Sequence, residues 1–228
     1  MDGIKSAFSE KRFIQNIVII VSVLFFLSGL CSLIYQILWT RILSLLFGHT
    51  TFAISTVIAA FMGGLASGSY FFGKWTEDDK GWIGRFLKKN GEASLFLAYG
   101  LIEFLIGIYA IATPFLFTVV EKIYLQFSYL SLFGISILRF LLCGLVLIGP
   151  TFMMGGTLPL LSRFLIRNFG ELSKKLSLLY FINTIGAATG AFLAGFFLIR
   201  TFGVTMSLMG TSLVNIIIGL FVYSLWRI

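Results

Sequence analysis

The sequence is dominated by apolar runs long enough to cross a lipid bilayer, and this feature limits the possible folds more than any other. A transmembrane helix needs roughly 20 predominantly apolar residues. Six such runs are predicted as spans, at about residues 14–38, 51–72, 93–120, 132–156, 176–199 and 204–226. They lack the alternating pattern of barrel strands, and only 11% of the residues are charged, against about 25% in soluble domains. We therefore predict an all-α integral membrane protein with a single transmembrane domain over residues 1–228.

The two halves of the chain share a pattern of glycines at a fixed offset. Arg41, Gly48, Gly64, Gly68, Gly73 and Gly81 recur 122 positions later as Arg163, Gly170, Gly186, Gly190, Gly195 and Gly203. Composition alone gives roughly one glycine match at a fixed offset, and this offset gives five, so we infer an internal repeat. The units cover about residues 14–120 and 132–228. Three spans is an odd number, so the units have opposite orientations, and the predicted inverted 3+3 repeat resembles half of a major-facilitator transporter.

The distribution of basic residues predicts the orientation of the chain in the membrane. The net charge is +8, and most basic residues lie in the N-terminal segment and in the two loops around residues 74–92 and 163–175. With the N-terminus inside, thirteen Lys and Arg residues fall on the cytoplasmic side and three on the other. The positive-inside rule then places both termini in the cytoplasm. The excess charge is explained by topology, and no nucleic-acid partner is expected.

Two charged residues fall inside predicted spans. Glu103 lies in the middle of the third span, and Arg139 lies about a third of the way into the fourth. A charge in hydrocarbon costs several kcal/mol, so each is expected to face protein and to find a partner. We predict a Glu103–Arg139 ion pair. Two roles stay open for it, a fixed pair that joins the two repeats and a substrate or proton site.

Other polar residues near the spans have simpler interpretations. Gln36 and Arg41 lie near the outer end of the first span, where an arginine can extend its charged group to the interface. Arg163 ends the fourth span on the inner side. Asn183 in the fifth span is expected to hydrogen-bond to a neighbouring helix rather than to a substrate.

Small residues repeat at four-residue spacing in the second and fifth spans. Gly64 and Gly68 form one such pair, and Gly186 and Gly190 form the other. Small residues at this spacing let helix backbones approach closely in lipid. Packing within one bundle is the expected role, and a homodimer interface is the alternative.

The chain lacks the motifs of a catalytic or cofactor site. It contains no glycine-rich nucleotide loop, zinc-protease motif or nucleophile elbow. Cys31 and Cys143 both lie within apolar runs and are expected to be buried free thiols rather than a disulfide. We predict no catalytic residue, no metal and no cofactor.

Four stretches carry a family resemblance: SGLCSLIYQILWTRILSLLFGHTTFAISTVIAAFMGGLASGSYFFG, LIEFLIGIYA, LRFLLCGLVLIGPTFMMGGTLPLLSRF and LYFINTIGAATGAFLAGF. Together they resemble the membrane domain of bacterial membrane-bound spermidine-synthase-like proteins, also described as fused major-facilitator/spermidine-synthase proteins. The resemblance implies a location in the bacterial inner membrane. In that family a cytosolic aminopropyltransferase-type domain usually follows, and this chain does not contain one. Glu103, Arg139 and Arg163 match the family pattern, whereas Gln36 stands where the family usually has Glu.

Two functions follow as expectations. The first is a non-catalytic membrane subunit or anchor that binds a partner, either a cytosolic synthase-like protein or a membrane complex. The second is a half-transporter that works as a dimer, with a polyamine or an apolar, lipid-like cargo. A polyamine needs several unpaired carboxylates, and the spans offer only Glu103, which disfavours that cargo. An enzyme acting within the membrane is the least expected class.

Overall fold

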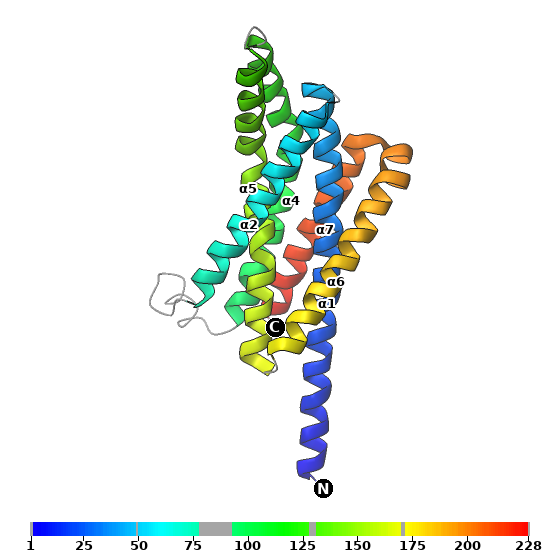
Figure 1. The fold of residues 1–228 in the computed structure, drawn as a ribbon. Helices are drawn as coiled ribbons and strands as arrows, with labels where there is room; N and C mark the ends of the chain where they lie inside the picture. The colour runs from blue at the N-terminus through cyan, green and yellow to red at the C-terminus, as the bar shows by residue number, and fades with distance from the viewer. Residues whose placement is uncertain (1, 49, 78–92, 128–130, 170–171, 228) are drawn as a thin grey trace.

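The computed structural model describes residues 2–48, 50–77, 93–127, 131–169 and 172–227, and all of its elements are helical (Figure 1). The helices are α1 (Asp2–Phe47), α2 (Thr51–Glu77), α4 (Ala93–Gln126), α5 (Leu132–Phe169), α6 (Leu172–Leu193), the π-helical turn η1 (Ala194–Leu198) and α7 (Ile199–Trp226). The predicted all-α class is confirmed. The basic loop at residues 78–92 and the turn at residues 170–171 lie outside the described residues.

Five helical segments are long and apolar enough to cross a membrane, whereas the sequence predicted six spans. They are Gln15–Phe47, Thr51–Thr76, Ser94–Gln126, Phe133–Ile166 and Lys174–Trp226. The last is 53 residues long and contains both the fifth and the sixth predicted spans. A straight helix of that length would measure about 80 Å, more than twice the thickness of a bilayer core. The long apolar helices make this a multi-pass membrane protein.

The long final segment is interrupted at Gly203. This residue has φ 73° and ψ 176°, a conformation outside the helix, and η1 precedes it by one turn. Such a φ and ψ are available essentially to glycine alone. Figure 1 shows the chain rising along α6 and returning along α7. Gly203 therefore lies where the chain reverses direction.

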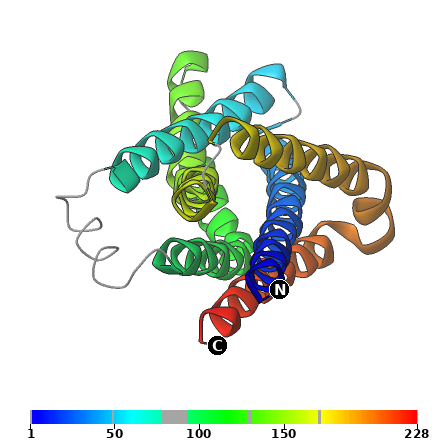
Figure 2. The same cartoon turned by 90° about the horizontal axis from the view of Figure 1, so that it is seen from below.

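Three helix pairs form the main contacts of the bundle: α2 with α5, α4 with α7, and α1 with α6. Successive long helices run in opposite directions, and α1 contacts each of the other helices (Figures 1 and 2). The N-terminal end of α1 extends beyond the bundle, at the end of the molecule where α7 finishes (Figure 1). We call this the lower end, and the end that holds the α1–α2 turn the upper end.

The helices are longer than the predicted spans. Helix α1 begins at Asp2 rather than near residue 14 and ends at Phe47, and α5 continues to Phe169. Helix α5 also passes through Pro150 and Pro159 without ending, although a proline inside a helix favours a kink or a break. A proline is tolerated in a membrane helix where neighbouring groups satisfy the freed backbone.

Large aromatic residues of α1 and α4 fill the interior, and apolar residues also cover the outside. Trp39, Tyr35, Tyr99 and Phe25 are almost completely buried. Phe52, Phe133 and Leu145 are among the large apolar side chains that are more than two-thirds exposed. An apolar outer surface of this kind is what a bilayer solvates.

Candidate functional site

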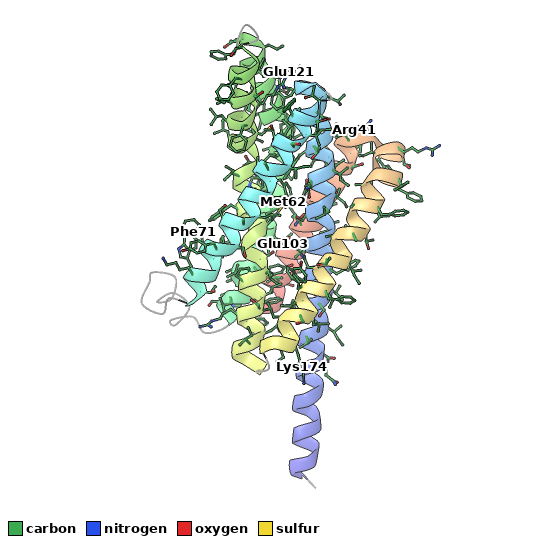
Figure 3. All side chains as sticks on the ribbon, in the orientation of Figure 1. Arg41, Met62, Phe71, Glu103, Glu121 and Lys174 are labelled. Atoms are coloured by element: carbon green, nitrogen blue, oxygen red, sulfur yellow. The ribbon has the colours of Figure 1, made fainter. Side chains whose placement is uncertain are left out.

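The centre of the bundle holds a buried carboxyl group, that of Glu103. Its side chain is fully buried, and Figure 3 shows it in the middle of the bundle, between Glu121 near the upper end and Lys174 near the lower end. The amide Nδ2 of Asn215 on α7 donates a short hydrogen bond to Oε2 of Glu103 on α4. An acidic group and a carboxamide thus join two helices inside the membrane-spanning part.

The hydrogen-bonded chain continues from Asn215 onto α1. The hydroxyl of Tyr35 donates to Oδ1 of Asn215 at 3.0 Å. The ring of Tyr35 stacks on Trp39 with the centroids 5.0 Å apart, and Nε1 of Trp39 donates to the hydroxyl of Thr113 at 3.2 Å. All of these side chains are at most 2% exposed. The polar groups of α1, α4 and α7 therefore satisfy one another away from water, as buried polar groups must.

One oxygen of the carboxyl group is not satisfied in this way. The hydroxyls of Ser28 and Tyr99 lie beside the Glu103 carboxyl group. Tyr99 donates its own hydrogen to the backbone carbonyl of Leu24 at 3.2 Å. Oε1 of Glu103 is buried and accepts no hydrogen bond from the described residues.

The structure does not form the predicted Glu103–Arg139 ion pair. Nε and Nη2 of Arg139 donate to the hydroxyl of Tyr124 at 3.2 and 2.8 Å, and the guanidinium lies 5.6 Å from the centre of the same ring. Tyr124 lies about six turns along α4 from Glu103, or roughly 30 Å. The prediction is wrong because Glu103 lies about a third of the way up α4, whereas Arg139 lies two turns from the start of α5 at the upper end.

The four predicted packing glycines all lie at helix contacts inside the bundle. A Cβ on Gly64 would collide with Thr151, and one on Gly68 with the carbonyl of Phe152, both on α5. A Cβ on Gly186 would collide with the carbonyl of Phe26, and one on Gly190 with that of Leu30, both on α1. The close approach of backbones expected for packing within one bundle is present at each of them.

The remaining predicted residues lie apart from Glu103. Arg41 is exposed near the upper end (Figure 3), and Gln36 is half-buried with no hydrogen-bond partner for Oε1. Arg163 is half-buried with an unpartnered Nε, at the level where its neighbour Phe164 stacks on Phe96. Asn183 packs against Gly29 of α1.

Two cavities lined mainly by apolar side chains lie near the central cluster. One of about 530 Å³ opens at the lower end between α1, α4, α5 and α7 and includes Phe96, Phe164 and Trp226. Another of about 400 Å³ lies beside η1 and includes Cys31 and Thr211, one turn from Tyr35 and Asn215. In the described residues no three His, Cys, Asp or Glu side chains come together as a metal site would require. Cys31 and Cys143 are buried free thiols, as predicted.

Asn215 was not predicted as the hydrogen-bond partner of Glu103, and Tyr35, Tyr99 and Ser28 were not predicted to lie around the two groups. A carboxamide in the middle of the apolar run SLVNIIIGL is a usable signal, because an unpaired amide in lipid is costly. Ser207, Thr211 and Asn215 recur at four-residue spacing and mark the buried face of α7, but the identity of the partner also needs the depth of α7 relative to α4.

Comparison of the chain with protein-family models, with curated proteins and with solved structures gives no match.

Proposed function

We propose that the protein is a non-catalytic subunit of the bacterial inner membrane that binds a partner protein, and that it is related to the membrane part of spermidine-synthase-like proteins. In this proposal both termini are cytoplasmic, and the partner is a cytosolic synthase-like protein or a membrane complex. The proposal is supported by the contrast between the interior of the bundle and the outer face of α2.

The outer face of α2 carries the observation on which the proposal rests. Small residues form an exposed stripe at helical spacing: Ser55, Ala59, Gly63 and Ala66. Nothing lies within 4 Å of a Cβ added to Gly63. Small residues allow close helix contacts in lipid, where apolar bulk gives no driving force for association. On the opposite face of the same helix, Gly64 and Gly68 already serve this purpose inside the bundle.

The interior supports binding at the surface rather than chemistry inside. The central hydroxyl, indole and amide groups of the described residues and one oxygen of the Glu103 carboxyl group are directed at one another, and the cavities beside them are lined mainly by apolar side chains. A binding surface on the outside of the bundle is then the simplest use of this domain.

A bulky residue on the α2 stripe tests the proposal. Gly63→Leu is expected to leave the thermal stability of the purified bundle unchanged and to abolish stoichiometric co-purification of the partner in mild detergent. Gly210→Leu on α7, also exposed with open space around it, is the matched control and should retain the partner. A partner that stays bound to Gly63→Leu as it does to the wild type contradicts the proposal.

A half-transporter that works as a dimer is the second candidate, and the repetition of one helix contact favours it. Gly68 meets Phe152, and Gly190 meets Leu30. Each residue of one contact lies 122 positions from its counterpart in the other, which is the repeat offset of the sequence. This supports six spans arranged as an inverted 3+3 repeat, the plan of half a major-facilitator carrier.

Uptake into proteoliposomes separates the two candidates. The purified protein alone should give no cargo-dependent flux above empty liposomes if it is a subunit. Flux of a polyamine or of a lipid-like cargo, together with a homodimer in detergent, would favour the transporter.

A further inference from the structure

We propose that Glu103 is a proton-binding site within the membrane, that it carries its proton on Oε1, and that it exchanges this proton with the lower end of the bundle past Tyr99 and Phe96. This inference concerns the state of one buried group and does not depend on whether the protein is a subunit or a carrier.

The first argument is the absence of a compensating charge. The titratable groups beside the carboxyl group are Tyr35 and Cys31 on α1 and Tyr99 on α4, while α7 offers the uncharged Asn215 and Ser212. All of them lack a positive charge. An ionised carboxylate at this depth would cost several kcal/mol with nothing to offset it, whereas a neutral carboxylic acid avoids that cost.

The charged residues of α5 do not change this balance. Arg139 is engaged by Tyr124, about six turns away along α4. Arg163 is next to Phe164, which stacks on Phe96 at 5.2 Å, so it lies about two turns below Glu103. Neither arginine forms an ion pair with Glu103 among the described residues.

The second argument is the inventory of hydrogen bonds. Oε2 accepts from Asn215, as a carbonyl oxygen of a carboxylic acid does. Oε1 accepts no hydrogen bond from the described residues, although the hydroxyl of Ser28 lies beside the carboxyl group, and the neighbouring Tyr99 has already given its hydrogen to Leu24. A proton on Oε1 turns this unsatisfied acceptor into a donor and gives it an acceptor, the hydroxyl oxygen of Tyr99.

The third argument gives the direction of exchange. Tyr99 stacks on Phe96 with the centroids 6.3 Å apart, and Phe96 lines the cavity of about 530 Å³ at the lower end. Two aromatic side chains, those of Tyr99 and Phe96, thus separate the unsatisfied oxygen from a cavity at the end of the bundle. Further along α1 towards the upper end, Tyr35 and Trp39 stack on each other, and Tyr35 is hydrogen-bonded to Asn215.

Infrared difference spectroscopy of the protein in lipid tests the protonation state. At neutral pH, wild type minus Glu103→Gln is expected to show the carbonyl band of a protonated carboxylic acid, lost in the variant. Glu121→Gln is the matched control, since Glu121 is an exposed carboxyl group at the upper end. It should leave the band of the protonated carboxylic acid unchanged. Loss of a carboxylate band in Glu103→Gln would overturn the proposal.

Deuterium exchange tests the route and does not need Glu103 to be replaced. Phe96→Ala is expected to speed the isotope shift of the protonated-carboxyl band at least several-fold after transfer to heavy water. Leu46→Ala, in a cavity near the upper end, should leave the rate unchanged. Asn215→Leu should raise the frequency of the same band, because it removes the hydrogen bond to the carbonyl oxygen. An exchange rate that responds to Leu46→Ala and not to Phe96→Ala would overturn the route.

Discussion

Ser32 of α1 contacts Met154 of α5, its hydroxyl donating to the sulfur at 3.6 Å, and the two residues are separated by 122 positions. This is the offset that relates the glycines of the two halves. When two units are related by a twofold axis, a residue that touches its own counterpart lies on that axis. The contact gives the proposed repeat a definite centre between α1 and α5.

The repeat predicts that equivalent glycines respond alike to substitution. Gly68→Leu and Gly190→Leu each force a side chain against a backbone carbonyl of the neighbouring helix, and each is expected to destabilise the bundle by about 1–3 kcal/mol or more. Thermal unfolding in detergent measures this. Gly63→Leu, in open space on the same α2 helix, is the control, and a large loss of stability there would contradict the packing described.

Gly203 is predicted to be intolerant of any side chain although it has open space around it. Its φ of 73° with ψ of 176° makes Gly203→Ala cost about 1–3 kcal/mol. Gly210→Ala, at an exposed helical position, is expected to gain about 0.5–1 kcal/mol from backbone entropy. Chemical or thermal unfolding of the two variants checks whether the free energy of unfolding falls for Gly203→Ala and rises for Gly210→Ala. Equal effects would mean that residue 203 is helical.

The sequence alone was sufficient for the helical class, because apolar run length predicts spans directly. Helix α1 continues past the predicted span to Phe47 and ends before Gly48, which has φ 91°. The length of α5 was harder to predict, because prolines favour the end of a helix, whereas the continuation of α5 past them depends on packing against neighbouring helices. The partner of Glu103 was not accessible, since it requires the relative depth and rotation of three helices.

Glu103 and Arg139 are predicted to behave as independent sites. Their separation means that the stability losses of Glu103→Gln and Arg139→Leu should add to within about 0.5 kcal/mol in the double variant. The stability losses of Arg139→Leu and Tyr124→Phe should not add in the double variant, because these two side chains share a hydrogen bond. A coupling energy above about 1 kcal/mol between Glu103 and Arg139 would restore the ion pair that the sequence suggested.

The proposed topology predicts opposite labelling at the two ends of the bundle. In a variant with Cys31 and Cys143 replaced by alanine, a cysteine at exposed Gln126 should react with a membrane-impermeant maleimide in intact cells. A cysteine at exposed Arg227 should react only after lysis. Labelling of both positions in intact cells would contradict cytoplasmic termini.

The stacking of Tyr35 on Trp39 has a practical consequence. Tyr35 is hydrogen-bonded to α7 through Asn215, and its ring lies against an indole that is completely shielded. Any shift of α7 relative to α1 must alter the surroundings of that indole, which is one of four tryptophans in the chain. Trp39 emission therefore offers a native fluorescent probe of motion in the bundle, without an attached dye.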